Sequence, residues 1–493
     1  MKDKIVKYLS SDRHLWWTVT ILPGAYAIVY LYLKNYTIVN SWQQLLSFIA
    51  CFIIIPSVLF LGLDLFFKKK YPAKRIQLYW SYLLINFSII FSLSIYLGWR
   101  WKALVLFGVL TIIASIFIAK HYKKIVLLLS LMLVIAIGQL LFFILTTVVP
   151  GNDWIENAPF ESYTFKKKPN IYLIQPDGFV GKPAATNSIY QLDNSDFYDS
   201  LEHEGFQFNH DFRSNYSSTL ASNSVLFTGQ HHYLPTASST TELMDARDII
   251  LGDNPVLRTL KKNGYQTNLI LQHSYLMLNY PEVIYDTNNV KSTDLSPLLP
   301  NYYLDKDYQG DFEKQLSISI GSDQPQFYFI EILHPGHISY SKDGEEAIES
   351  ERIKYTEEVK NIIPKLIDMT RLISSKDPEA IIILASDHGG FAGFTHTGQA
   401  YSNVIKSNEL KQSVFSSLLS IKAPKEFKSY QSNIKSTVAV FPTLFDYLVD
   451  KPVLDQHDID HSSYLFLKSK EYLGLYKYFD SDGIPVSEKV ILP

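Results

Sequence analysis

The chain has little cysteine and little charge, and these two shortages exclude several kinds of site and classes of protein. Cys51 is the single cysteine among 493 residues, so the sequence holds no disulfide framework and no cysteine-type metal site. The formal net charge is −3, and no domain is strongly basic, as a nucleic-acid binder would be. Internal repeats and low-complexity segments are also missing from the sequence. We therefore expect no nucleic-acid partner.

Apolar residues, in contrast, are abundant and concentrate before Pro150. Five stretches there are long enough to cross a bilayer as helices, at about 14–33, 43–67, 77–99, 102–119 and 123–149. A removable signal peptide does not explain the first stretch, because no small-residue cleavage site follows it and further stretches come after it. A buried helical core is the alternative, but several stretches approach or exceed about 20 residues almost without charge. We predict a five-helix transmembrane domain over residues 1–150.

Lysine and arginine are shared unevenly between the loops of this domain. They concentrate in the N-terminal tail, in the loop 68–75 and in the loop 120–124, whereas the other side has only Lys34, Arg100 and Lys102. Positively charged loops stay in the cytoplasm. The N-terminus is therefore predicted to be cytoplasmic. An odd number of crossings then puts the chain after Pro150 at the outer face of the cytoplasmic (inner) membrane.

The rest of the sequence predicts a linker and an α/β domain. Residues 151–169 are polar and contain prolines, as a linker does, and residues 170–493 form the external domain. Apolar runs typical of buried strands alternate with helical patterns, and such strands favour a mostly parallel sheet with helices on both faces. The strands are expected at 170–175, after Gly264, at 326–333 and at 380–386, and the helices from Asn254, at about 345–375 and at 441–449.

Residues with metal-binding or acid–base side chains follow these strands. Asp177 comes after the first, His334 and His337 after the strand 326–333, and Asp387 with His388 after the last. In such sheets ligands bind beyond the carboxyl ends of the strands. Three strand ends with such residues therefore predict a functional site at the carboxyl-terminal edge of the sheet.

Each of these residues also has an ordinary structural interpretation. Asp177 lies in a Pro-Asp-Gly turn, which is common, and histidines in loops are often surface residues. The Asp387–His388 pair is the stronger signal, because the two glycines after it let the backbone bend sharply. His396 lies eight residues beyond His388 and can return to the same site. Hard oxygen ligands with one imidazole suit one divalent ion, Zn²⁺ or Mn²⁺.

A hydroxyl-rich segment, "SNYSSTLASNSVLFTG" at 214–229, precedes an apolar run. It contains seven serine and threonine residues, any of which could be a nucleophile. A metal ion lowers the pKa of a hydroxyl and lets it attack phosphorus or sulfur. It also stabilises the charge that builds on the equatorial oxygens. Together these segments predict phosphoryl-type transfer through a covalent intermediate.

Over about 170–450 the chain resembles the alkaline phosphatase superfamily. More narrowly, it resembles the sulfatase-like branch of the membrane-anchored lipoteichoic acid synthases and phosphoethanolamine transferases. The shared order is strand and aspartate, a segment ending in "LFTG", "LKKNGYQT", a histidine loop, "SDHGG" and "FPTLFDYL". In sulfatases the nucleophile lies ten residues before the glycine of that ending, and the membrane transferases are similar in using threonine there. Counting back from Gly229 identifies Thr219, with Ser222 as the serine that commonly follows.

The resemblance implies a role for each candidate residue, as a metal ligand, as a catalytic group or as a substrate contact. Histidines of such sites touch the phosphoryl oxygens or protonate the leaving alcohol. The implied metal ligands are Asp177, Thr219, Asp387 and His388, the catalytic residues are Thr219, His337 and His396, and the substrate contacts are His334 and Ser222.

The chain departs from the family pattern at several positions. Asp177 stands where transferases often have glutamate, which keeps a carboxylate ligand but shortens its reach. Asn223 occupies the position of the sulfatase arginine, and the absence of cysteine also weighs against a formylglycine sulfatase. The arginine that would clamp the phosphate stays open among Arg213, Arg247 and Arg258.

The implied activity is a membrane-bound transfer of phosphoglycerol or phosphoethanolamine. The donor would be phosphatidylglycerol or phosphatidylethanolamine, and the acceptor a cell-envelope glycan or glycolipid. Phosphoethanolamine transferases of this branch usually have disulfides in the external domain, so the lack of cysteine there favours phosphoglycerol. An extracytoplasmic phosphodiesterase or sulfatase-like hydrolase is the alternative. An inactive sensor or scaffold is a third possibility, and the retention of Thr219 with its implied metal ligands argues against it.

Overall fold

The computed structural model describes residues 2–11, 13–96, 101–149, 154–155, 157–234, 242–296, 304–339, 344–449 and 459–491. The chain divides into two compact units. The first comprises residues 1–151 with two short later segments, 278–280 and 293–301. The second comprises 152–277, 281–292 and 302–493.

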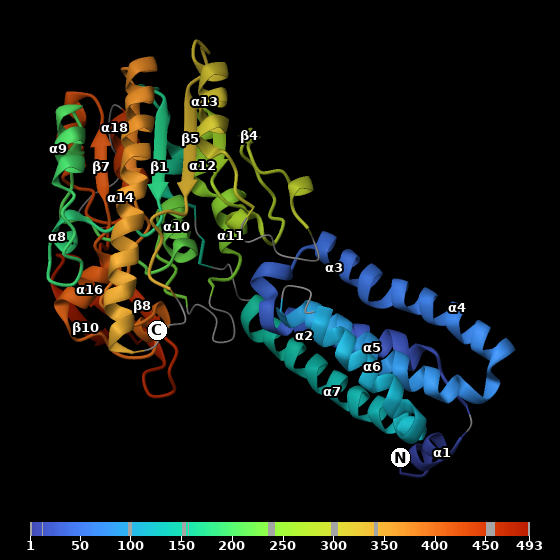
Figure 1. Ribbon diagram of the computed structural model, residues 1–493. Helices are drawn as coiled ribbons and strands as arrows, with labels where there is room; N and C mark the ends of the chain where they lie inside the picture. The colour runs from blue at the N-terminus through green and yellow to red at the C-terminus, as the bar shows by residue number, and fades with distance from the viewer. Residues whose placement is uncertain are drawn as a thin grey trace. The chain divides into compact units, whose positions relative to one another are not determined.

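The first unit is helical. Each predicted apolar stretch is helical over most of its described residues, which satisfies the backbone polar groups within the segment (Figure 1). The α-helices are α1 (Lys2–Ser10), α2 (Trp17–Val39), α3 (Trp42–Ile49), α4 (Ile55–Lys70), α5 (Arg75–Tyr96), α6 (Trp101–Ile118) and α7 (Tyr122–Phe143). Short turns of other helix types extend or join them, namely η1 (Ala50–Ile54), η2 (Pro72–Lys74), η3 (Ala119–His121) and η4 (Ile144–Val148).

Three helical stretches among the described residues are long and apolar enough to cross a membrane, Trp42–Lys70, Pro72–Leu93 and Trp101–Val148. The third contains two predicted crossings, α6 and α7, which η3 joins, and α2 is not among the three. Large apolar side chains are exposed along α4, α6 and α7. Helices that are apolar toward their surroundings suit a membrane rather than water. The total of five crossings stays a prediction.

The second unit is built on a seven-stranded sheet in the order β2-β7-β6-β1-β5-β3-β4. The strands from β6 to β4 are parallel, β7 is antiparallel to β6, and β2 is antiparallel to β7. The predicted mostly parallel sheet is therefore confirmed. The strands are β1 (Ile171–Pro176), β2 (Gln207–Phe208), β3 (Gln266–Leu271), β4 (Thr287–Asn288), β5 (Gln326–Ile332), β6 (Ile381–Ala385) and β7 (Leu419–Lys422).

Helices cover both faces of this sheet, as the apolar strands predicted. On one face Tyr328 of β5 joins a core built with α9 (Ser195–His203), α13 (Tyr308–Ser319) and α14 (Glu345–Lys376). On the other face the ring of Phe329 lies 5.0 Å from Phe227 of α10 (Thr219–Thr228), and Phe327 lies 5.9 Å from Phe441 of α18 (Val440–Leu448). Successive residues of β5 thus face different layers.

Shorter helices and a second sheet complete this unit. The second sheet is antiparallel, in the order β10-β9-β8, and its apolar residues share a core with the segment around α16. Its strands are β8 (Ser463–Leu467), β9 (Gly474–Phe479) and β10 (Pro485–Lys489). The shorter helices are α8 (Lys182–Ala185), α11 (Ala246–Leu251), α12 (Pro255–Lys262), α15 (Thr397–Ala400), α16 (Asn408–Phe415) and α17 (Lys428–Gln431), with 3-10 turns at η5 (Pro159–Ser162), η6 (Ser274–Met277), η7 (Ser292–Asp294), η8 (Lys425–Phe427) and η9 (Thr437–Ala439).

Candidate active site

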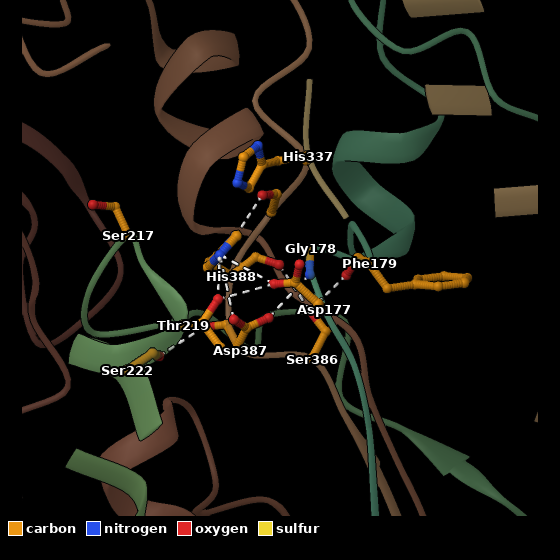
Figure 2. A network of polar contacts seen from close by, with 12 residues as sticks. Asp177, Gly178, Phe179, Ser217, Thr219, Ser222, His337, Ser386, Asp387 and His388 are labelled. Atoms are coloured by element: carbon orange, nitrogen blue, oxygen red, sulfur yellow. Dashed lines mark hydrogen bonds and ion pairs between the residues drawn. The ribbon is translucent and has the colours of Figure 1, made fainter. Parts of the chain in front are cut away.

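The ends of two neighbouring strands bring three of the predicted residues together. Asp177 follows β1 directly, and Asp387 with His388 comes just after β6. Because β1 and β6 are paired in parallel, their carboxyl ends share one edge of the sheet. Figure 2 shows the three side chains pointing toward one another.

These side chains form a compact buried cluster. His388 Nε2 lies 3.4 Å from Oδ1 of Asp177 and 3.3 Å from Oδ2 of Asp387. One ligand atom from each residue lies within 4.8 Å of the other two, and all three residues are buried. Among the described residues this is the group of three that could hold a metal ion.

Thr219 of helix α10 joins this cluster. Helix α10 begins at Thr219, so this residue lies at a helix N-terminus. Its Oγ1 donates to Oδ1 of Asp177 at 3.1 Å and lies 3.5 Å from Nε2 of His388. The first N–H groups of a helix have no partner within it, and they favour a bound anion. A phosphoryl group near this hydroxyl would therefore meet a favourable field.

The donor atoms fit a divalent cation. Nδ1 of His388 donates to the carbonyl oxygen of Gly389 at 2.8 Å, which leaves the lone pair on Nε2 facing the carboxylates. Oδ1 of Asp387 accepts from the N–H of Gly178 at 3.0 Å, whereas its Oδ2 is buried and has no hydrogen-bond partner among the described residues. Two carboxylates, an imidazole and a hydroxyl suit a cation such as Zn²⁺ or Mn²⁺. Once bound, such an ion neutralises the carboxylates and acidifies the hydroxyl.

Burial strongly perturbs the carboxyl group of Asp387 in this cluster. It raises the pKa of Asp387 to about 7, with a further contribution from Asp177 and an opposing one from His388. For His388, burial acts to lower the pKa, but the two carboxylates outweigh it and raise the pKa above its usual value. Carboxylates held so far from water are costly unless a cation compensates them.

A further acid near this cluster was not among the predicted site residues. Glu331 of β5 is fully buried, and neither carboxylate oxygen has a hydrogen-bond partner among the described residues. Burial, and then the charges of Asp177 and Asp387, raises its pKa well above the usual range. A lone glutamate inside the apolar run 326–333 is the signal that could have identified it.

Two buried hydroxyls support the cluster from behind. Ser222, predicted to contact substrate, is fully buried and donates to the carbonyl oxygen of Asp387 at 2.7 Å. This hydroxyl therefore supports the backbone of Asp387, and the predicted contact between Ser222 and a substrate stays a prediction. Tyr355 of α14 donates to the carbonyl of Gly178 at 2.8 Å and accepts from the N–H of Val180 at 3.0 Å. Sequence reasoning missed Tyr355, since an aromatic residue at helical spacing is usually part of a core.

Two of the predicted histidines line a cavity of about 420 Å³ that reaches Asp177. The ring centre of His337 lies 6.0 Å from that of His388, and its Nδ1 donates to a backbone carbonyl at 2.8 Å. His334 lies three residues earlier in the same loop, with Nδ1 2.8 Å from the side-chain nitrogen of Gln272 and 3.0 Å from its side-chain oxygen. Among the described contacts, His337 is the one of the two whose ring lies next to His388.

His396 and the three candidate arginines are not part of the three-residue cluster. His396 is partly buried and lies at the N-cap of α15. Arg247 and Arg258 each pair with a glutamate, at 2.8 and 2.7 Å. The guanidinium carbon of Arg213 lies 5.5 Å from the centre of a phenylalanine ring. The described contacts therefore identify no arginine as the phosphate clamp.

Comparisons with known proteins give matches in shape alone. No family model matches the chain, and no curated protein matches it. Similar solved structures include an integral membrane lipooligosaccharide phosphoethanolamine transferase from Neisseria meningitidis. The identity is 14%, the match covers 80% of this chain and 79% of that protein, and the TM-score is 0.39.

Two further solved structures are also similar to the chain. The periplasmic domain of a phosphoethanolamine transferase from Campylobacter jejuni is 16% identical to this chain, with a TM-score of 0.38. The match covers 57% of this chain and 90% of that domain. A lipoteichoic acid synthase from Listeria monocytogenes is 12% identical, with 67% and 91% coverage and a TM-score of 0.41.

Proposed function

We propose that the chain is a membrane-bound, metal-dependent transferase of the alkaline phosphatase superfamily. It moves phosphoglycerol or phosphoethanolamine from a phospholipid onto a cell-envelope glycan or glycolipid. The observation that carries this proposal is the Thr219 hydroxyl at the start of α10, in contact with both Asp177 and His388. A nucleophile beside a metal-type donor set and a helix N-terminus suits phosphoryl transfer.

The proposed membrane arrangement has five crossings in residues 1–150 and a cytoplasmic N-terminus. A linker over 151–169 then leads to a catalytic domain over 170–493 at the outer face. The apolar stretches Trp42–Lys70, Pro72–Leu93 and Trp101–Val148 support membrane insertion. An outer-face site has access to phospholipid donors and envelope acceptors.

In the first half-reaction the oxygen of Thr219 attacks the donor phosphorus and loses its proton. The bond between phosphorus and the diacylglycerol oxygen breaks, and that oxygen takes up a proton as diacylglycerol leaves. His337 is the proposed proton carrier, because its Nδ1 is engaged with a backbone carbonyl and its Nε2 is left for exchange. His396 is proposed to assist at the phosphoryl oxygens.

In the second half-reaction an acceptor hydroxyl attacks the phosphothreonine. It loses its proton, the bond from phosphorus to Thr219 breaks, and the threonine oxygen regains a proton. Ser222 and Gly178 keep Asp387 in place through both steps, by the hydrogen bonds to its carbonyl and carboxylate oxygens. His334 is proposed to contact the headgroup in the cavity beside Asp177.

The test is a half-reaction with labelled phosphatidylglycerol or phosphatidylethanolamine and Mn²⁺ or Zn²⁺. We expect diacylglycerol release and a phosphoglycerol or phosphoethanolamine adduct on Thr219, measured by intact-mass analysis. Thr219→Ala should abolish both, and Thr219→Ser should retain adduct formation because it keeps the hydroxyl. Thr228→Ala is the matched control, since its hydroxyl bonds to Ser224 at the other end of α10. Unchanged turnover in Thr219→Ala would exclude this nucleophile.

The same preparation separates the transferase from a hydrolase. In a phosphodiesterase or sulfatase-like hydrolase, water would take the acceptor's place, and soluble esters would be cleaved without a lipid donor. Release of free phosphate or sulfate from soluble esters, with no diacylglycerol from either lipid, would favour that alternative. The absence of cysteine from residues 152–493 favours phosphatidylglycerol as the preferred donor.

A further inference from the structure

The helical unit contains a long apolar groove that the proposed reaction does not use. Its volume is about 970 Å³, within the range of protein ligand sites, and α4, α5 and α6 line it together with residues of η1 and η2. Most of the lining side chains are isoleucine, leucine and phenylalanine. It follows α5 from the Lys74 end to Leu93, which is about 28 Å at the rise of an α-helix.

Polar side chains line the groove near one end. Lys74, Gln77 and Ser81 follow one another at helical spacing, and all three line it. The side chains of Gln77 and Ser81 are partly buried and form no hydrogen bond with another described residue. This end therefore offers hydrogen-bonding groups that are available to a partner from outside the protein.

The same end carries uncompensated positive charge. Lys74 forms no ion pair with a described carboxylate, and three further lysines end helix α4 at 68–70. Asp64 is the acid of α4, and Arg75 already pairs with it at 2.7 Å. A lysine cluster of this kind next to a membrane attracts anionic lipid headgroups.

We propose that this groove binds one anionic phospholipid, with its phosphate at Lys74 and its acyl chains against α4, α5 and α6. Gln77 lies about 5 Å below Lys74 along the helix, a separation close to the thickness of the interfacial layer, and it can donate to an ester carbonyl. Ser81 lies one helical turn deeper, and beyond it the acyl chains of the lipid contact the apolar side chains of the groove. In the predicted orientation this lipid belongs to the cytoplasmic leaflet. It is therefore a bound lipid separate from the donor at the outer face.

The test uses the full chain in phosphatidylcholine bicelles that contain a minor fraction of phosphatidylglycerol. The single native cysteine is replaced (Cys51→Ala), and Ile85→Cys gives one thiol in the middle of the groove for a bimane label. Brominated phosphatidylglycerol should quench this label at a lower lipid fraction than brominated phosphatidylcholine. A label at Ile137→Cys, on the exposed face of α7, should show no such preference.

Two variants separate the charged end from the apolar part. Lys74→Gln should weaken the preference for phosphatidylglycerol about five-fold, the factor that corresponds to about 1 kcal/mol for one lysine near the membrane surface. Lys120→Gln, outside the lining residues, is its control and should leave the preference unchanged. Ile113→Trp should reduce quenching by both lipids because it fills the groove.

Three results would overturn the proposal. Equal quenching by the two lipids would show that the groove has no headgroup preference, and an unchanged preference in Lys74→Gln would remove the assigned phosphate contact. Efficient disulfide formation between two copies of Ile85→Cys would show that a second chain occupies the groove. Thr219→Ala should keep the lipid preference, so failure of the proposed transferase activity is distinguishable from failure of this site.

Discussion

Replacing Asp387 with asparagine should stabilise the metal-free protein and remove its response to metal. The carboxylate is fully buried, and its Oδ2 has no hydrogen-bond partner among the described residues. An ionised group in that position destabilises the folded state unless a cation compensates it. The substitution Asp387→Asn would remove the charge, while the side-chain oxygen of the new amide could still accept from the N–H of Gly178.

The magnitude follows from the shift in the pKa of Asp387. Burial, the largest cause, raises that pKa from 3.8 to about 7, and each pKa unit corresponds to about 1.4 kcal/mol. The full shift would give about 4 kcal/mol, and the coupling to Asp177 and His388 makes about 2–4 kcal/mol the reasonable range. The folded state binds this proton more tightly than the unfolded state. The wild-type free energy of unfolding therefore falls as the pH rises from about 4 to about 7, and in Asp387→Asn this fall should be missing.

The assay is thermal and denaturant unfolding of the full chain in detergent, at pH 5 and pH 8, with chelator or with metal. With chelator at pH 8, Asp387→Asn should be more stable than the wild type. At a metal concentration of about 100 times Kd, the free energy of unfolding of the wild type should rise by about 2.7 kcal/mol, and that of the variant should not rise. Asp368→Asn, at an exposed position of α14, is the control and should change stability by less than about 0.5 kcal/mol.

Two outcomes would refute this reasoning. If Asp387→Asn is less stable than the wild type in chelator at pH 8, the buried charge is not the dominant cost. If the variant keeps the metal-induced stabilisation, Asp387 is not a ligand of the ion.

Substitutions around the cluster should separate packing from chemistry. Gly178→Ala should lower the free energy of unfolding by more than about 2 kcal/mol and weaken metal binding, because the new Cβ would lie 2.3 Å from a backbone oxygen. Gly264→Ala is the control for denaturant unfolding. This glycine also has a positive φ but open space around it, so the substitution should lower the free energy of unfolding by only about 1 kcal/mol. Ser222→Ala should cost about 1–3 kcal/mol and reduce kcat, since the Asp387 carbonyl loses its buried donor; a calorimetric stability unchanged within error would contradict this. Tyr355→Phe should weaken metal affinity in a titration by leaving two backbone groups of the Asp177 loop unpaired, and an unaltered affinity would assign this tyrosine to packing alone.

Several features of the fold could be predicted because they depend on local pattern. The run 380–386 is apolar on both faces and became β6, and Asn254 with Gly264 bounds a helix and the strand after it. The edge of the sheet could not be predicted in the same way. Strand β2 has only two residues, which is too short for a periodic pattern. Strand β7 runs antiparallel to β6, and the sequence pattern of a strand does not indicate its direction in the sheet.

The supporting residues of the site depend on neighbours that no local pattern reveals. Tyr355 lies inside a long amphipathic helix, and its hydroxyl bonds to Gly178, 177 positions earlier in the chain. Ser222 is one of several hydroxyls in its segment, and only its hydrogen bond to the backbone carbonyl of Asp387 shows that it supports this residue. The raised pKa of Glu331 similarly depends on burial and on the charges of Asp177 and Asp387, which lie far from it in the sequence.

By itself, the sequence determined the apolar helices, the buried strands and the residue types at the strand ends, because periodicity and side-chain chemistry are local properties. It could also limit the nucleophile to a short hydroxyl-rich segment. The tertiary structure decided which atoms meet. Thr219 is 42 positions from Asp177 and 169 positions from His388, and only the pairing of β1 with β6 and the direction of α10 bring their side chains within 3.5 Å.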